Sequence, residues 1–321
     1  MPAARMPRVR TRAFGVRAIG DRVFNLTTLV LALTILALLA GLTLELFVNA
    51  LPSIKAFGLG FLVSSDWDPT TDQYGALPFI FGTAVSSGLA LLIAVPLALG
   101  VALCLSEMAP DWLSRKLGFL VELLAAIPSV VYGLWGIFVA GPWLRDHLDP
   151  VLAKYLGFLP FFQGPQVAVS MLTASVILAI MVLPYISAVC TDVFRAVPRT
   201  QREAALALGA TKWEMVRMAV LPFGVSGIIG AVILGLGRAL GETIAVAMVI
   251  GNSPQISASL FMPSATLASV IANEFVEATS NLNLAALVEL GLVLLVLGLI
   301  LNIAARLLVY GATQRRFQGP A

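Results

Sequence analysis

Two charged residues lie four positions apart inside a long apolar stretch of the sequence. Arg238 and Glu242 interrupt the run over residues 223–251, together with three glycines at positions 235, 237 and 241. An arginine guanidinium presents a planar fork that matches two oxygens of a phosphate or a carboxylate. A carboxylate nearby would accept a proton from a protonated oxyanion and so distinguish phosphate from fully deprotonated sulfate. The pair is a candidate anion site, and the alternative is an ion pair that only neutralises both groups.

The composition of the chain indicates that these charges lie in a membrane. Of the 321 residues, 59% are hydrophobic and 12% are charged, whereas soluble proteins average about 45–50% and about 25%. A soluble surface cannot be built from so few polar residues, which excludes soluble enzymes and disordered proteins. The formal net charge of +3 is too small to indicate binding to nucleic acid. We therefore expect an all-α integral membrane protein.

Six apolar stretches are long enough to cross a bilayer as helices, which takes about 20 residues each. The first stretch exceeds the apolar part of a cleavable signal peptide, about 7–15 residues, so it is expected to remain as a helix. Together the stretches predict a transmembrane domain over residues 24–310, preceded by a basic segment (1–23) and followed by a short tail (311–321). The spans are expected near residues 24–48, 79–105, 118–144, 167–190, 223–251 and 284–305.

The distribution of basic residues predicts the orientation of the chain. Lysine and arginine near helix ends are retained on the cytoplasmic side of a membrane. Of the 20 basic residues, Arg238 lies inside a span and only Lys55, Arg145 and Lys154 lie on one side. The other 16 lie on the opposite side, so both termini are expected in the cytoplasm. These are Arg5, Arg8, Arg10, Arg12, Arg17, Arg22, Arg115, Lys116, Arg195, Arg199, Arg202, Lys212, Arg217, Arg306, Arg315 and Arg316.

Other polar residues within the spans are weaker candidates for the substrate pathway. Pro128 in the third span removes one backbone hydrogen bond, which predicts a kink, and Ser129 beside it is placed to satisfy the freed carbonyl or face the pathway. Tyr132 follows one turn later, and Thr83 lies in the second span. Between the last two spans, residues 264–278 have helical spacing but are too polar to cross, so a short helix at the outer surface is expected.

The loop over residues 192–222 carries the most specific local pattern. Thr200 with Glu203, and Thr211 with Glu214, have the spacing of a capping box at the start of a helix. Gly209 between them offers the left-handed conformation that ends a helix. We expect two short helices that either insert a small apolar face into a partner protein or lie as a hairpin on the membrane surface. The apolar face consists of Ala204, Ala205, Leu206 and Leu208.

The residues needed for metal, redox or ATP chemistry are not found. Cys104 and Cys190 lie in separate apolar runs, and His147 is the single histidine, so no metal or redox site is expected. A phosphate-binding loop needs a lysine after a glycine, and none of the four lysines follows one. The chain is therefore expected to be no enzyme and to bind no cofactor itself.

The loop pattern resembles the EAA loop of ABC importer permeases. In that family the short helix of this loop docks on an ATPase subunit. The resemblance implies a type I ABC importer permease fold with a five-helix core plus an added first span, and a partner ATPase that binds ATP and magnesium on the cytoplasmic face. The one departure is Ala219, where the family pattern usually has isoleucine. The residues that carry the resemblance are Glu203, Ala204, Ala205, Gly209, Leu221 and Pro222.

Three further stretches resemble phosphate-importer permeases, and specifically the PstC-type subunit. They are residues 235–246 (GLGRALGETIAV), 75–83 and 123–136. The resemblance implies a heterodimeric pore with a PstA-type permease, two PstB-type ATPase subunits and a periplasmic PstS-type phosphate-binding protein, in the plasma membrane of a bacterium. It also implies that Arg238 and Glu242 act in the translocation of phosphate. Membrane lipid is expected to surround the chain, and nucleic acid is not an expected partner.

Three alternatives remain open on the sequence. The first is a permease for another oxyanion such as sulfate or molybdate, against which Glu242 argues. The second is a membrane receptor or signalling scaffold that uses the cytoplasmic helices without transport. The third is a proton-coupled secondary transporter, which would not need an ATPase-docking loop.

Overall fold

A computed structural model of the chain describes residues 14–317, with side-chain surroundings for residues 20–304, 306 and 307. Within that part, five helices are long and apolar enough to cross a membrane, and a sharply bent helix pair makes a sixth span if it is counted as one. The predicted all-helical membrane architecture is thus confirmed. The five helices cover Gly20–Phe57, Leu77–Met108, Met171–Arg195, Lys212–Leu240 and Asn281–Ala304.

The first helix, α1, is longer than the sequence pattern predicts. It runs from Phe14 to Phe57 without interruption, and its residues up to Asn49 form a unit separate from residues 50–321. Four threonine hydroxyls along it donate to the carbonyl four residues earlier, which satisfies them in apolar surroundings. Of the predicted basic segment, residues 1–13 lie outside the described part of the chain.

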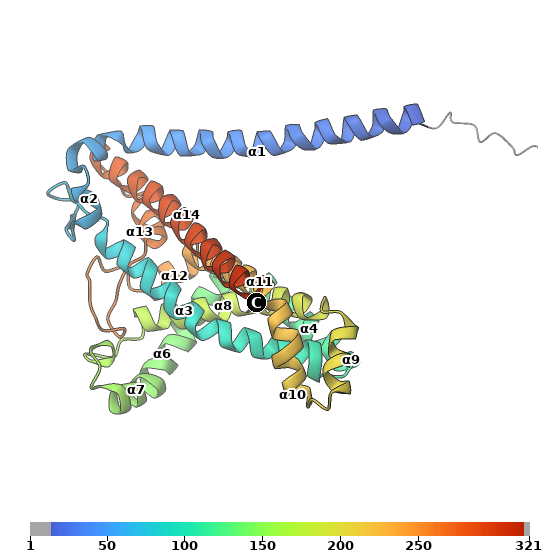
Figure 1. Cartoon of the computed structure of the whole chain (residues 1–321). Helices are drawn as coiled ribbons and strands as arrows, with labels where there is room; N and C mark the ends of the chain where they lie inside the picture. Colours follow the sequence, from blue (N-terminus) through green and yellow to red (C-terminus); the bar gives the residue numbers. More distant parts are fainter. Residues whose placement is uncertain (1–13, 318–321) are drawn as a thin grey trace, which may run out of the picture. The chain divides into compact units, whose positions relative to one another are not determined.

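The second unit begins at Ala50, within the last turns of α1, and continues through short elements into the main helices (Figure 1). Its first half contains α2 (Gly60–Val63), β1 (Trp67–Asp68), β2 (Gln73–Tyr74), α3 (Leu77–Leu103), η1 (Cys104–Met108), α4 (Asp111–Ala126), α5 (Ser129–Trp135), η2 (Gly136–Ala140), α6 (Gly141–Trp143), η3 (Leu144–Leu148), α7 (Asp149–Leu156) and η4 (Pro160–Phe162). Strands β1 and β2 pair antiparallel, with Trp67 opposite Tyr74.

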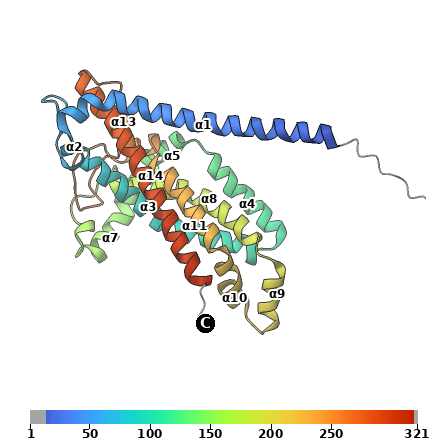
Figure 2. The same cartoon turned by 45° about the horizontal axis from the view of Figure 1, so that its top comes forward.

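The second half contains the predicted cytoplasmic helices and the last spans. It comprises α8 (Met171–Arg195), α9 (Arg199–Ala207), α10 (Lys212–Met215), η5 (Val216–Val220), α11 (Leu221–Leu240), α12 (Ile244–Val249), α13 (Leu267–Glu274) and α14 (Asn281–Phe317). Helix α13 is the short helix expected within residues 264–278. Figure 2 shows α9 and α10 side by side at one end of this unit, with α2 and α13 at the other.

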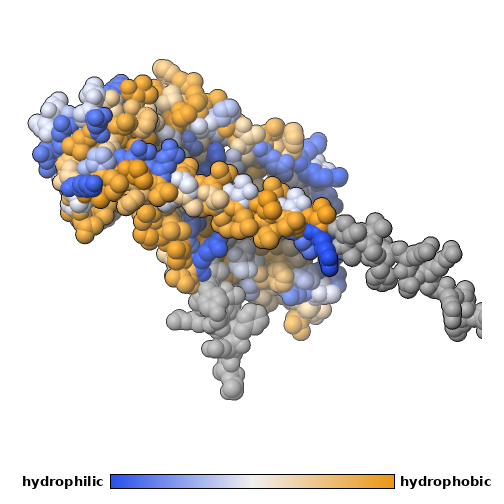
Figure 3. Space-filling model, turned by 90° about the horizontal axis from the view of Figure 1, so that it is seen from above, coloured by the Kyte–Doolittle hydropathy of each residue, from blue (hydrophilic) through white to orange (hydrophobic). Residues whose placement is uncertain are grey.

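Helix α8 forms the centre of the second unit, and α3 and α11 pack on it. Small residues allow this close approach. Ala90, Ala94, Ala98 and Ala102 form a fully buried row on α3, and a side chain at Gly235 of α11 would collide with α8. Large apolar side chains remain exposed outside this core, and hydrophobic residues cover much of the face seen in Figure 3. Such a surface suits contact with lipid chains.

The third predicted span is broken rather than kinked. Helix α4 ends at Ala126, α5 begins at Ser129, and the axes on the two sides differ by 88°. Proline pushes the residue before it out of the helical region, and Ile127 accordingly has an extended conformation with ψ 129°. The prediction of one span over residues 118–144 with a kink at Pro128 is therefore wrong in this detail.

The fifth predicted span is also interrupted, which changes the geometry of the candidate anion site. Helix α11 ends at Leu240, and the chain continues through Gly241 and Thr243 before α12 begins at Ile244. Glycine is a poor helix former, and the Glu242 carboxylate accepts a hydrogen bond from the backbone of Ala245 in the first turn of α12 (3.3 Å). In an unbroken helix over the predicted span 223–251, the four-residue spacing would place residues 238 and 242 on one face, but the break between them means that they do not share one.

Candidate functional site

Arg238 lies in the last turn of α11 and is held by an aromatic ring from α8. Its guanidinium carbon is 4.3 Å from the centroid of the Tyr185 ring, which is a favourable cation–π distance. The Nε atom is buried and has no hydrogen-bond partner among the described residues. An arginine with an unpartnered buried donor inside a membrane domain is suited to binding an anion.

Two tyrosines connect this arginine to the break after α4. Tyr185 donates a hydrogen bond to the carbonyl of Ala125 (2.8 Å), and Tyr132 of α5 donates to the carbonyl of Leu124 (2.9 Å). The last carbonyls of a helix have no partner within the helix, so the hydroxyls satisfy groups that the break leaves open. Tyr132 is also within electrostatic range of Tyr185 and Arg238. We call Tyr132 and Tyr185 the tyrosine clamp.

Arg238 and Glu242 are each held separately. Only two ion pairs occur among the residues with described side chains, and neither involves these two groups. The guanidinium lies near the C-terminal end of α11, where the helix dipole favours a positive charge, and the carboxylate lies at the N-terminal end of α12, where it favours a negative one. An Arg238–Glu242 pair is therefore not formed in this structure.

The other two pathway candidates differ in their surroundings. Thr83 is fully buried where α3 meets α13, and its hydroxyl donates to the carbonyl of Phe79 (2.7 Å) and accepts from the backbone of Leu267 (2.9 Å). These bonds use it to hold α13, and its contacts do not bring it to Arg238. Ser129 is half-buried and is the first residue of α5, directly after the break that the tyrosine clamp spans.

The predicted cytoplasmic loop folds into two short helices, as expected. Gly209 has φ +85° and ends α9, as predicted. The capping box at Thr211 is confirmed, since its backbone donates to Glu214 (2.8 Å) and its hydroxyl accepts from the Glu214 backbone (3.3 Å). The capping box predicted at Thr200 is wrong, because α9 already begins at Arg199 after Pro198 and no side chain caps it.

The exposed face of this loop is smaller than predicted. Glu203, Ala204 and Leu206 are exposed, and Leu208 is 89% exposed. Ala205 is buried against the core of its own chain instead, because it points inward on α9. Leu221 and Pro222 are half-buried in the first turn of α11.

No sequence pattern predicted the contact that anchors α9 to the membrane helices. Arg202 pairs with Glu107 of η1 through two hydrogen bonds, at 2.8 and 3.2 Å. The same guanidinium donates to the carbonyls of Phe194 (2.7 Å) and Val197 (2.6 Å) at the end of α8. The pair is largely buried, with side-chain exposures of 18% and 7%. One arginine thus links α9 to the ends of both α3 and α8.

The fold and these sites agree with what the chain is similar to. Residues 94–313 match the family described as binding-protein-dependent transport system inner membrane component. Over 293 residues the chain is 47% identical to the phosphate transport system permease protein PstC of Haemophilus influenzae, covering 90% of this chain and 93% of that protein. The PstC protein of Mesorhizobium japonicum is 44% identical over 311 residues, covering 95% and 94%.

Solved structures support the fold independently. The chain matches a subunit of the MetNI methionine ABC transporter in an inward-facing conformation, with TM-score 0.54 and 17% identity over 73% of this chain and 94% of that one. At that identity the match concerns the fold alone, and it confirms the predicted type I importer permease fold. The family match and the identity over nine-tenths of the chain show that this chain belongs to the family of inner membrane components of binding-protein-dependent transport systems.

Proposed function

We propose that this chain is one permease subunit of an ATP-driven importer of inorganic phosphate. The similarity to proteins named as phosphate transport permeases supports the substrate class. The proposal rests mainly on Arg238, whose guanidinium lies over the Tyr185 ring while its buried Nε has no hydrogen-bond partner among the described residues. A phosphate oxyanion accepts from such a planar fork at two of its oxygens.

Glu242 then acts as the group that selects a protonated oxyanion. Its carboxylate lies four positions after Arg238, beyond the end of α11, and accepts one weak backbone bond at 3.3 Å. Its remaining lone pairs are able to accept the proton of a monohydrogen or dihydrogen phosphate. Sulfate carries no proton at neutral pH and would be repelled by the carboxylate. Ser129 and Thr83 remain weaker candidates for the pathway.

Energy is supplied by other chains. We infer that this subunit forms a pore with a second permease of the PstA type, and that two PstB-type subunits bind ATP and magnesium and hydrolyse the ATP. The exposed residues Ala204, Leu206 and Leu208 of the α9 region are the surface offered to an ATPase. A PstS-type binding protein delivers phosphate from the opposite side. The excess of basic residues predicts that both termini lie in the cytoplasm.

The test is uptake of labelled phosphate into vesicles that contain this chain, a PstA-type permease and a PstB-type ATPase. The PstS-type binding protein is added to the assay. ATP-dependent uptake that excess sulfate or molybdate does not compete with is expected. Uptake of another oxyanion instead of phosphate would refute the substrate assignment. ATPase stimulation by the loaded binding protein without any uptake would favour a receptor.

A further inference from the structure

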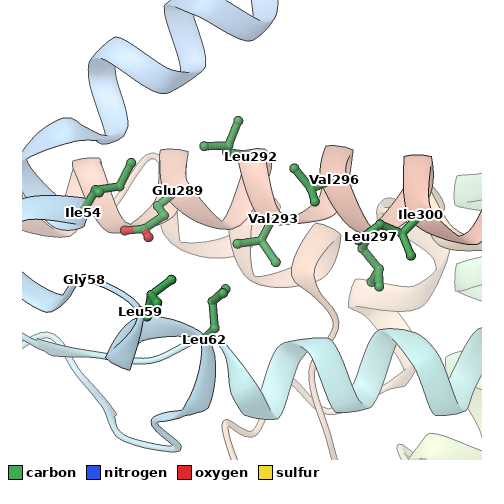
Figure 4. Close-up of a pocket in the computed structure, with 10 residues that line it drawn as sticks. All are labelled: Ile54, Gly58, Leu59, Leu62, Glu289, Leu292, Val293, Val296, Leu297 and Ile300. Carbon is green, nitrogen blue, oxygen red and sulfur yellow. The ribbon is translucent and has the colours of Figure 1, made fainter.

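A groove with a volume of about 470 Å³ opens beside α14, away from the Arg238 site (Figure 4). One face of α14, from Glu289 through Val293 to Ile300, forms one wall. The end of α1 and helix α2 form the other wall, with Ile54, Leu59 and Leu62. Every lining residue except Glu289 is aliphatic or glycine, so the groove is apolar along its length and carries one ionisable group.

Glu289 is the unusual member of this lining. Glu289 is only 6% exposed, and its Oε2 atom makes no hydrogen bond. Ser53 of α1 is fully buried and its hydroxyl lies next to this carboxyl group, although the contact does not meet hydrogen-bond geometry. Figure 4 shows the carboxyl group pointing from α14 toward the end of α1. Neither ion pair of the described side chains involves Glu289.

A buried carboxyl group that forms no ion pair and whose Oε2 makes no hydrogen bond is costly in apolar surroundings, by several kcal/mol for an ionised group. Natural proteins retain such a group inside a membrane domain mainly where it serves a ligand or a relay. Because Arg238 and Tyr185 do not line the groove, a role in the proposed anion pathway does not explain Glu289. The unsatisfied acceptor therefore points to a ligand that brings a hydrogen-bond donor.

The shape and charge of the groove indicate what that ligand is. The wall from residue 289 to residue 300 is about 16 Å long at the helical rise of 1.5 Å per residue, which matches a hydrocarbon chain lying along α14. A lipid headgroup that donates a hydrogen bond to a carboxylate binds it best when the headgroup is positively charged and carries N–H groups. A quaternary ammonium has no N–H to donate, and an anionic head would be repelled.

We propose that this groove binds an aminophospholipid, with the primary ammonium on Glu289 and one acyl chain along Val293, Val296 and Leu297. Side chains on a helix lean toward its N-terminal end, so the carboxyl group of Glu289 points toward the start of α14. That end lies beside α13, away from the predicted docking helices α9 and α10 (Figure 2). The lipid occupies the leaflet on that side. The site is independent of the proposed phosphate transport.

The experiment measures lipid retention by the full-length chain. The purified protein is placed in nanodiscs with equal amounts of phosphatidylethanolamine and phosphatidylglycerol, and the lipids that remain bound are counted by native mass spectrometry. Wild type is expected to retain about ten times more phosphatidylethanolamine than phosphatidylglycerol. This preference corresponds to the free energy of about one charge-assisted hydrogen bond. Glu289→Gln is expected to reduce this ratio to about one, because the amide is uncharged.

Two further variants keep the test decisive. Glu45→Gln changes an exposed acidic residue of α1 and is expected to leave the ratio unchanged. Val293→Trp is expected to fill the groove and lower the retention of both lipids together. The proposal is overturned if Glu289→Gln keeps the wild-type ratio, or if wild type shows no headgroup preference. It is equally overturned if a photo-crosslinker at position 293 captures a partner permease instead of lipid, since the groove would then be a protein interface.

Discussion

The guanidinium of Arg238 lies on the ring of Tyr185, 4.3 Å from its centroid, and the hydroxyl of the same tyrosine bonds the end of α4. The residue that is proposed to bind phosphate is therefore oriented by a neighbour that is itself fixed to a helix break. A movement of α4 relative to α8 would disturb the ring and hence the arginine. This relationship connects the position of the helices to the state of the proposed anion site.

Replacing Tyr185 tests this positioning role in two steps. Tyr185→Phe keeps the ring and loses the hydrogen bond to Ala125, so a modest rise in the KM for phosphate uptake is expected. Tyr185→Leu also loses the ring, and with about 0.5–2 kcal/mol for the cation–π contact the KM should rise roughly two- to thirty-fold. Tyr155→Phe, at an exposed tyrosine of α7, is the control. Equal KM values for Tyr185→Leu and wild type would contradict the role.

The Arg202–Glu107 pair should be required for coupling between ATP hydrolysis and transport. Arg202→Lys keeps the charge but cannot reproduce the fork that holds Glu107 and the carbonyls at the end of α8. Breaking a buried pair costs about 3–5 kcal/mol, so we expect lower thermal stability and ATP hydrolysis that no longer drives uptake.

The control for that variant is Arg145→Lys, which alters the other ion pair of the described chain. Arg145 and Asp146 are exposed, at 44% and 52%, and exposed pairs contribute little. Uptake per ATP hydrolysed should therefore match wild type. If Arg202→Lys behaves like Arg145→Lys, the pair does not transmit coupling.

Gly209→Val should disrupt docking of the ATPase. At φ +85° a β-branched residue is strained by at least about 1–2 kcal/mol, so the end of α9 should shift. Co-purification of the ATPase is expected to fall while membrane insertion is retained. Gly118→Val is the matched change, since Gly118 has no positive φ and open space around its Cβ position. Normal co-purification of the Gly209 variant would show that this corner is not needed.

Glu274 should make stability depend on pH. Burial raises the pKa of this carboxyl group, and the nearby Glu277 raises it further, against the hydrogen bond from Trp67 that lowers it. The folded state then binds the proton more tightly than the unfolded state, so the stability contributed by Glu274 is present at low pH and lost as pH rises through the folded pKa. Thermal unfolding of Glu274→Gln should show a weaker fall between acid and neutral pH. An unchanged pH profile would contradict the assignment.

Local patterns predicted much of the fold, and contacts distant in sequence were not predictable. The capping box at Thr211 and the turn at Gly209 depend only on neighbouring residues, and both were found as expected. The end of α11 was missed because an apolar run of span length hides a break at Gly241. The Arg202–Glu107 contact joins residues 95 positions apart, and only the packing of α3, α8 and α9 brings them together. Tyr185 was missed for the same reason.

In the proposed mechanism, Arg238 binds the transported anion and is not merely the partner of Glu242. The most direct measurement is ATP-dependent phosphate uptake by the double variant Arg238→Gln with Glu242→Gln, compared with Arg238→Lys and Glu242→Gln alone in equally assembled complexes. Removing both charges leaves no unpaired charge, so uptake would recover if the groups only neutralised each other. We predict that uptake stays lost in the double variant and is poor in Arg238→Lys. Near wild-type uptake by the double variant would show that Arg238 is not the anion ligand.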